Sequence, residues 1–266
     1  MEQNSKFDLW LKGVVITLVT IAAILLTFPF IQNYYALQIK NSETTHYRST
    51  PPNSMPTAET IHALKLRDML GVKGENKDAI GRVLIPSVGL DDNIYVGLTN
   101  GNLAVGAVTM FPKRVPVQHN VVLLGHNVGF KGLHFGLLSQ VKLKEKIYLN
   151  YLNRYYQYQI YRVESINETE IEKVKDISDS QLSLVTCSAP TRTPKRILVR
   201  ANLVKVLNTP SEKKQMRSVA KTTANKSLIQ LHNGMWQMVW LPIFAIVIVY
   251  TIVMIILLKQ MNQKNK

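Results

Sequence analysis

The chain has 266 residues and a formal net charge of +15 at pH 7, from 32 Lys and Arg against 17 Asp and Glu. This length leaves room for one core of modest size once the two apolar ends are set aside. Nucleic-acid binding is not expected, because no recognisable reading motif occurs and the glycines are scattered rather than grouped in a phosphate-cradling loop. The positive charge instead indicates attraction to anionic headgroups and anionic polymers, in addition to an ordinary solvated surface.

The first apolar run covers residues 13–31, which carry no charged side chain. A helix over this run covers roughly 28 Å at about 1.5 Å per residue, close to the ~30 Å hydrocarbon thickness of a bilayer. A cleaved signal peptide is the alternative, but the run is longer than a typical signal core and residues 28–32 offer no small-x-small cleavage site. We therefore expect a membrane-spanning helix, preceded by a cytoplasmic tail at 1–12.

The second apolar run covers residues 235–258, again without a charge, and contains Trp236 and Trp240 near its start, where such rings settle at the membrane interface. It is long enough to span a bilayer with tilt. Lysines flank both runs on their outer sides, which favours cytoplasmic termini, including a second tail at 259–266. The sequence thus predicts two spans, a location in the cell membrane and an extracellular domain between the spans.

The segment between the first span and the domain, residues 32–78, is predicted to be a stalk or linker. Its clearest linker signal is the proline-rich stretch 49–56. A short helix is expected at 57–70, because Thr57 can cap it, Gly71 can end it and its apolar residues fall near one face.

From residue 79 to residue 207 the chain consists of short β-rich runs separated by turns. Such runs without long helices between them favour a closed or nearly closed barrel over a parallel sheet. The helical pieces expected inside are 133–138 and 168–175, and a polar linker at 208–234 follows the domain. The expected strands cover residues 80–85, 93–96, 120–124, 146–151, 155–163, 181–186 and 196–206.

Three residues at the ends of apolar runs indicate a nucleophilic site. Cys187 is the only cysteine and ends one run, Arg196 opens the next run, and His126 ends a third. A single cysteine is more often a small buried hydrophobe than a catalyst. However, an unpaired thiol in a domain expected on the oxidising side of a membrane is a hazard unless it is used. We therefore favour a cysteine nucleophile assisted by a histidine.

Other basic residues compete with these candidates. Arg192 lies in a proline-flanked loop, where a fixed geometry is harder to hold, and Arg200 lies roughly 13 Å further along the strand than Arg196. Arg196 is therefore preferred. His119 and His134 lack the Gly-His setting at a strand end, so both are expected to be surface or loop residues. Neither has the spacing of a zinc motif, so no metal and no cofactor is expected.

With these residues in view, the chain resembles a sortase, a cysteine transpeptidase that attaches proteins to the cell wall of Gram-positive bacteria. The resemblance covers residues 79–207. It rests on the stretch 80–90, on Gly125-His126, and on the run from 184 to Cys187 followed by 196–199. It implies an all-β fold, with a closed eight-stranded β-barrel and short helices as the catalytic domain.

The resemblance also implies a role for each candidate. Cys187 would be the nucleophile, His126 the general acid and base, and Arg196 the stabiliser of the oxyanion. A nearby imidazolium and guanidinium would stabilise the thiolate. Thr186 would contact the substrate through its hydroxyl, with an ordinary strand-facing threonine as the alternative. A narrow groove with apolar walls would hold the substrate, and the expected wall residues are Val105, Ala107, Leu184 and Ile197.

The implied reaction is cleavage of an LPxTG-like sorting signal between Thr and Gly through a thioester, followed by transfer to the amine of a peptidoglycan precursor. The expected partners are LPxTG-bearing surface proteins, that precursor and the membrane, but no nucleic acid. The housekeeping type is favoured over the pilin-polymerising type, which uses a lysine amine, because residues 68–70 lack an Asp-Pro-aromatic lid motif. A membrane-bound cysteine hydrolase and a non-catalytic surface module with a structural cysteine stay open as alternatives.

Overall fold

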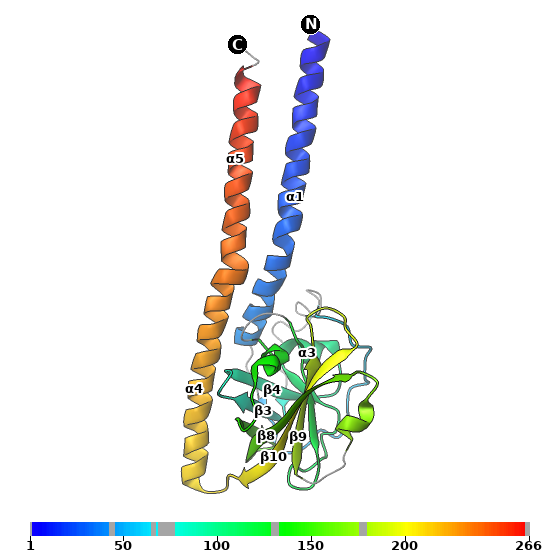
Figure 1. Ribbon diagram of the computed structural model, residues 1–266, viewed down its shortest axis with the longest axis vertical. Coiled ribbons are helices and arrows are strands. Elements are labelled where there is room, and N and C mark those ends of the chain that lie inside the picture. Colours follow the sequence, from blue (N-terminus) through cyan, green and yellow to red (C-terminus); the bar gives the residue numbers. More distant parts are fainter. Residues whose placement is uncertain are drawn as a thin grey trace. The chain divides into compact units, whose positions relative to one another are not determined.

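A computed structural model describes residues 2–42, 46–64, 68, 78–128, 133–175 and 180–263 (Figure 1). The chain divides into two compact units. One comprises Met1–Tyr34 and Met235–Lys266, and the other comprises Tyr35–Gly234. All three residues expected to carry out catalysis lie in the second unit.

Within the described residues, the second unit forms a closed barrel of eight strands in the order β10-β8-β7-β3-β4-β5-β6-β9, which confirms the expected barrel. The β4–β5 and β6–β9 pairs are parallel, and the other pairs are antiparallel. The parallel β6–β9 pair brings the C-terminal ends of two strands to the same edge of the barrel. The strands are β3 (Gly81–Ile85), β4 (Leu90–Val96), β5 (Ala107–Thr109), β6 (Val121–Leu124), β7 (Lys146–Tyr151), β8 (Arg154–Asn167), β9 (Gln181–Cys187) and β10 (Lys195–Val206).

Alternation of side chains along the strands builds the core inside this barrel. On β8, Tyr156, Tyr158 and Ile160 are buried, while the residues between them are more exposed. One apolar cluster contains inward-facing residues from every barrel strand and also Phe135, from the short 3-10 helix η1 (Phe135–Gln140). Because the core is continuous around the barrel, the strand ends that carry the candidate residues rest on a packed base.

Among the described residues, three short helices lie between the barrel strands. The α3 helix (Asn100–Val105) connects β4 to β5, and the Thr99 side chain caps it by accepting a hydrogen bond from the Asn102 N–H. The helical piece expected at 133–138 corresponds to η1, and the piece expected at 168–175 corresponds to the shorter 3-10 helix η2 (Ile171–Val174).

The expected linker at 208–234 is instead part of a helix, α4 (Pro210–Met235). Thr209 and Glu212 form a capping box, since the Thr209 hydroxyl accepts from the Glu212 N–H over 3.3 Å and the Glu212 carboxylate accepts from the Thr209 N–H over 3.0 Å. Pro210 occupies the first helical turn, where its missing N–H costs nothing. The sequence signal was therefore present, but the polar composition of the stretch concealed it.

The α4 helix packs on the outside of the barrel. Met216 is buried against Leu84 of β3, Tyr148 of β7 and Leu207. Further along α4, the Lys226 ammonium donates to the carbonyl of Pro86 over 3.2 Å and to that of Ser87. The folded unit therefore extends beyond residue 207, where the sequence predicts its end.

The segment before the barrel differs from the expected helix at 57–70. Residues 57–64 form no regular helix, and of residues 65–70 only Asp68 lies within the described part of the chain. The main chain pairs with the barrel instead, because the Glu59 N–H donates to the Leu98 carbonyl over 2.9 Å. Nearby, β1 (His46–Tyr47) and β2 (Asp78–Ala79) form a separate two-stranded parallel sheet.

The two runs predicted to span a membrane, 13–31 and 235–258, are helical. They fall in α1 (Glu2–Ser42) and in the stretch from the end of α4 through the π-helical turn η3 (Trp236–Trp240) into α5 (Leu241–Gln263). In the described part of the chain, however, no helix is both long and apolar enough to cross a membrane. The prediction of helices is therefore correct, and the prediction that they span a membrane is not supported.

Candidate active site

The C-terminal ends of β6 and β9 are joined by two hydrogen bonds. The Gly125 N–H donates to the Val185 carbonyl over 3.1 Å, and the Thr186 hydroxyl donates to the Gly125 carbonyl over 2.8 Å. These bonds keep the two strands in register beyond Leu124 and Val185, the last paired residues of β6 and β9. As a result, His126 and Cys187 lie at the same edge of the barrel.

The neighbouring strand β10 supplies Arg196. Arg196 is the direct register partner of Cys187 in the antiparallel β9–β10 pair. Directly opposed residues in such a pair project to the same side of the sheet. His126, Cys187 and Arg196 all line one cavity of ≈ 580 Å³. The structure thus brings together the three residues that the sequence singles out.

The glycine before His126 is required by close packing. A Cβ atom at Gly125 would lie 2.5 Å from the Cγ atom of Phe135, whose ring is fully buried in the core. The absence of a side chain lets the end of β6 rest directly on this ring. The Gly-His pair in the sequence therefore reflects how tightly His126 is attached to the core.

Cys187 is a free, half-buried thiol at the end of β9. Its main-chain carbonyl accepts a hydrogen bond of 3.0 Å from Nδ2 of Asn127. The residue that follows His126 thus holds the main chain of Cys187. Sequence reasoning did not identify Asn127, although its position directly after His126 was a usable signal.

His126 is buried, with 7% of its surface exposed. Burial, together with the charge of His134 and that of His62, lowers the pKa of His126 to about 4, against the opposing effect of Asp68. Among the described residues, Nε2 of His126 has no hydrogen-bond partner. The ring is therefore neutral at pH 7 in the free protein, whereas the sequence-based interpretation assumed an imidazolium.

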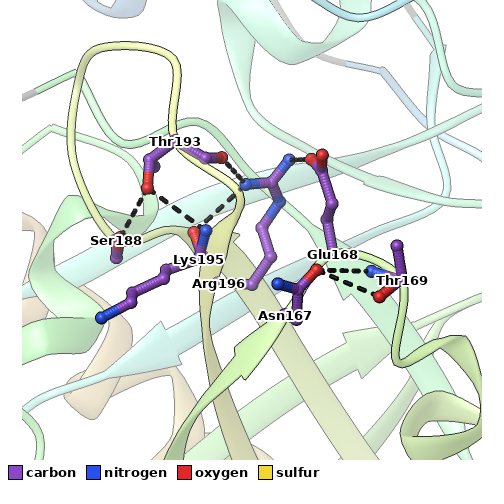
Figure 2. A network of polar contacts seen from close by, with 7 residues as sticks. All are labelled: Asn167, Glu168, Thr169, Ser188, Thr193, Lys195 and Arg196. Carbon is purple, nitrogen blue, oxygen red and sulfur yellow. Dashed lines mark hydrogen bonds and ion pairs between the residues drawn. The ribbon is translucent and has the colours of Figure 1, made fainter.

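The Arg196 guanidinium is held by three acceptors (Figure 2). Its Nη2 atom lies 2.5 Å from Oε2 of Glu168, and its Nη1 atom donates to the Lys195 carbonyl over 3.1 Å and to the Thr193 carbonyl. The Glu168 side chain is half exposed and also lines the cavity. This carboxylate lies between β8 and η2, so only the folded barrel brings it next to Arg196.

The two loops that meet at Arg196 are also connected through their main chains. The Glu168 N–H donates to the Pro194 carbonyl over 2.8 Å, which ties the turn after β8 to the β9–β10 loop. The side-chain oxygen of Asn167 accepts from both the N–H and the hydroxyl of Thr169, over 3.2 and 3.1 Å. The position of Glu168 is therefore set by its own turn as well as by Arg196.

Of the two arginines that compete with Arg196, only Arg192 borders the cavity. Arg200 does not line the cavity, and its guanidinium bonds the Lys173 carbonyl and lies 3.8 Å from Glu164. Arg192 does line the cavity and is exposed on the β9–β10 loop. The preference for Arg196 over Arg200 thus agrees with the placement of both side chains.

The expected groove residues are placed differently. Thr186 lines the cavity, but its side chain is buried and its hydroxyl bonds Gly125. The other four lie outside the lining, because Ala107 and Leu184 belong to the barrel core, Ile197 packs against it and Val105 is buried in α3. Apolar sequence runs do not reveal which face of a strand borders a groove. The apolar lining consists of Ile61, Ala63, Leu98, Leu103, Leu124, Val185, Ala189 and Pro190.

The segment before the barrel contributes residues 60–63 to the same cavity. It is attached to the start of α3, since the Asn100 side chain accepts from the His62 N–H over 3.2 Å and donates to the Glu59 carboxylate over 2.9 Å. His62 also lies 3.6 Å from Asp68. No motif in the sequence indicates that this segment borders the site.

Comparison with known proteins places this chain in a family. The family model of the Sortase domain matches residues 83–204. Sortase A of Listeria monocytogenes is 31% identical over 203 residues, which cover 73% of this chain and 91% of that protein. Sortase A of Bacillus anthracis is 29% identical over 196 residues, which cover 72% of this chain and 93% of that protein. A crystal structure of the Listeria monocytogenes sortase A is 33% identical, covers 51% of this chain and 95% of that chain, and has a TM-score of 0.48.

Proposed function

The chain belongs to the sortase family of cysteine transpeptidases of cell-wall sorting, and we propose that Cys187, His126 and Arg196 carry out its acyl transfer. The observation that carries this proposal is that three adjacent parts of the barrel edge, the ends of β6 and β9 and the start of β10, direct these side chains to one cavity. Cys187 is the only cysteine in the chain, so no second thiol can replace it.

Because its pKa is low, His126 is neutral in the free protein and must accept a proton before it can donate one. A neutral imidazole accepts the thiol proton of Cys187 as Sγ attacks the scissile carbonyl carbon. The resulting imidazolium then donates this proton to the leaving amine as the carbon–nitrogen bond breaks and the thioester forms. In the second half, the incoming amine attacks the thioester carbon and its proton passes to His126. The Cys187 sulfur then leaves and takes this proton from His126, which restores the thiol and the neutral ring.

Arg196 is suited to stabilise the negative charge on the carbonyl oxygen. A guanidinium has five N–H donors, and in the free protein two on Nη1 and one on Nη2 are engaged by the protein's own acceptors. Within the described part of the chain, the Nε donor and the second Nη2 donor have no acceptor and are left for a substrate oxygen. A fixed guanidinium that keeps its charge at any working pH is well matched to an oxyanion.

The substrate that we propose is an LPxTG-like sorting signal cleaved between Thr and Gly, and the acceptor is the amine of a cell-wall precursor at the cell envelope. The apolar lining residues Ile61, Leu98 and Leu103 suit the Leu-Pro part of such a signal. Transfer to a wall precursor is favoured over pilin polymerisation, because the segment that borders the cavity has Asp68 without a following proline and aromatic residue.

The decisive experiment uses the full chain with a short sorting-signal peptide and records intact-protein mass. Wild-type protein should gain the mass of the acyl fragment, and Cys187→Ala should neither gain mass nor cleave the peptide while its circular dichroism stays unchanged. Ser188→Ala, the neighbouring hydroxyl variant, serves as the matched control and should remain active. Turnover by Cys187→Ala would refute the assignment.

The acceptor is tested in the same assay. An added glycine peptide should appear in the product if the protein is a transpeptidase for a small amine. Formation of acid product alone, at all amine concentrations, would favour the hydrolase alternative. Transfer to a lysine of a pilin domain, without transfer to the glycine peptide, would favour the pilin-polymerising alternative.

A further inference from the structure

Two titratable side chains outside the cavity, those of Asp92 and His134, are buried against each other in the barrel. Asp92 lies on β4 opposite Val83, a residue of the barrel core, and its carboxylate Oδ1 atom is 3.2 Å from Nδ1 of His134. Both side chains are only 1% exposed. A carboxylate and an imidazole in an apolar core cost more free energy than an apolar pair of the same size. Such a pair beside a candidate active site therefore points to a functional role.

The main chain at His134 is also unusual. Its φ of 48° and ψ of −150° are rare for a residue with a side chain. Backbone of this kind persists only where the surroundings fix it, and it gathers at functional sites. Here the ring is held by Asp92, and the main chain forms an antiparallel bridge with Asn127.

The same short stretch is bonded to both candidate catalytic residues. The Phe135 N–H donates to the His126 carbonyl over 3.1 Å. Asn127, the bridge partner of His134, donates from Nδ2 to the Cys187 carbonyl over 3.0 Å. A continuous path of contacts thus leads from Asp92 through His134 to the main chain of both His126 and Cys187.

We propose that Asp92 and His134 form a positioning pair that fixes the His126 ring relative to Cys187. This inference rests on the proposed function, since it assigns the pair to the proton transfers of that site. Neither residue lines the cavity, so the pair acts through His126 and does not touch the substrate. Anchoring the histidine in this way replaces the carboxylate that orients the base in many other nucleophilic sites.

The pair also contributes to the electrostatics of His126. The charge of His134 is, after burial, the second cause that lowers the pKa of His126. Removing it should therefore raise that pKa, whereas a group with a purely structural role would leave it unchanged. Two other titratable groups around the ring, Asp68 and His62, come from the segment before the barrel. Those that line the cavity with His126 are Cys187, Arg192, Arg196 and Glu168.

The test compares His134→Gln and Asp92→Asn in the full chain. Gln keeps a donor for the Asp92 carboxylate but removes the ionisable ring, and Asn keeps the shape of Asp92. We expect kcat to fall about tenfold in each variant while KM stays within about twofold, because orientation rather than binding is lost. In His134→Gln, the NMR titration of the His126 Cε1–H signal should shift upward by about half a pH unit or more.

Asp91→Asn is the matched control. Asp91 is the neighbouring carboxylate on β4, and it pairs with Arg82 away from His126, with contacts of 2.6 and 2.5 Å. This variant should leave kcat and the His126 titration unchanged. The proposal would be overturned if both His134→Gln and Asp92→Asn kept the wild-type kcat and the wild-type His126 titration. It would also be overturned if both variants unfolded, because the pair would then serve folding alone. The His126 titration can be measured without turnover, so it tests the positioning pair even if the proposed reaction is wrong. A failure of the proposed reaction would instead show as a wild-type protein that forms no acyl-enzyme.

Discussion

Arg196 is oriented by acceptors of its own chain before any substrate arrives. The Thr193 carbonyl of the β9–β10 loop, the Lys195 carbonyl at the start of β10 and the Glu168 carboxylate fix the plane of its guanidinium. A planar fork that is already oriented loses less conformational freedom when it binds an oxyanion than a free side chain would. Glu168 therefore has a defined part in the site even though it is half exposed.

Replacing Glu168 by Gln tests this part. The exposed position limits the contribution of the ion pair to about 1 kcal/mol or less. We therefore expect kcat/KM to fall by about threefold to fivefold, as measured with a sorting-signal peptide. Glu170→Gln is the control, since Glu170 pairs with Lys173 and does not line the cavity.

A double-mutant comparison shows whether Glu168 acts through Arg196. In an Arg196→Lys background, which lacks the planar fork, Glu168→Gln should have almost no further effect on kcat/KM. An equal loss in both backgrounds would mean that Glu168 acts on the substrate or the fold by another route.

His126 should make the folded protein sensitive to acid. Its pKa is about 4 in the folded state, against 6.5 for an exposed histidine, so the unfolded chain binds the proton more readily. The stability that this neutral ring contributes is fully present above pH 6.5 and is lost as the pH falls towards 4. At about 1.4 kcal/mol per pH unit, the total loss is about 3 kcal/mol.

This loss is measured by urea unfolding at pH 7 and pH 4, in the wild type and in His126→Asn. Other groups also titrate in this range, so the relevant quantity is the difference between the two proteins. The free energy of unfolding should fall by about 3 kcal/mol more in the wild type than in the variant. An identical fall in both would show that His126 titrates normally in the folded state.

At the level of elements, the end of β6 depends on one close contact. Gly125 rests on the ring of Phe135, and the next residue is the candidate base. Packing in this region is dense, so a single added methyl group must displace either the ring or the strand end. The geometry of His126 is therefore linked directly to the packing of η1 beneath it.

Gly125→Ala should destabilise the protein by about 1–3 kcal/mol, the usual cost of overpacking a core. Activity should fall in the protein that remains folded, because the strand end that carries His126 is displaced. Thermal unfolding and peptide cleavage measure the two effects. Gly13→Ala is the control, since a Cβ there meets no atom within 4 Å. Wild-type behaviour of Gly125→Ala in both assays would show that the strand end moves freely over Phe135.

The sequence predicts the barrel well because alternation along strands such as β8 is a local property of the chain. It also predicts the three candidate residues, since each lies at the end of an apolar run. The groove walls were misplaced because burial of Ala107 and Leu184 in the core depends on which strand face turns inward. Glu168 and the Asp92–His134 pair could not be predicted, since each contact joins residues that only the folded barrel brings together.

For the whole molecule, closure of the barrel has a consequence for folding. The β6–β9 pair joins Val121 to Leu182, and two other barrel strands, β7 and β8, lie between them in the sequence. Ordering so long a loop is entropically costly, so pairings of this kind are slow to form. His126 and Cys187 therefore meet only when the barrel closes. A partly folded chain carries a thiol without its base, and the ability to form an acyl-enzyme arises in the same cooperative step as the native fold.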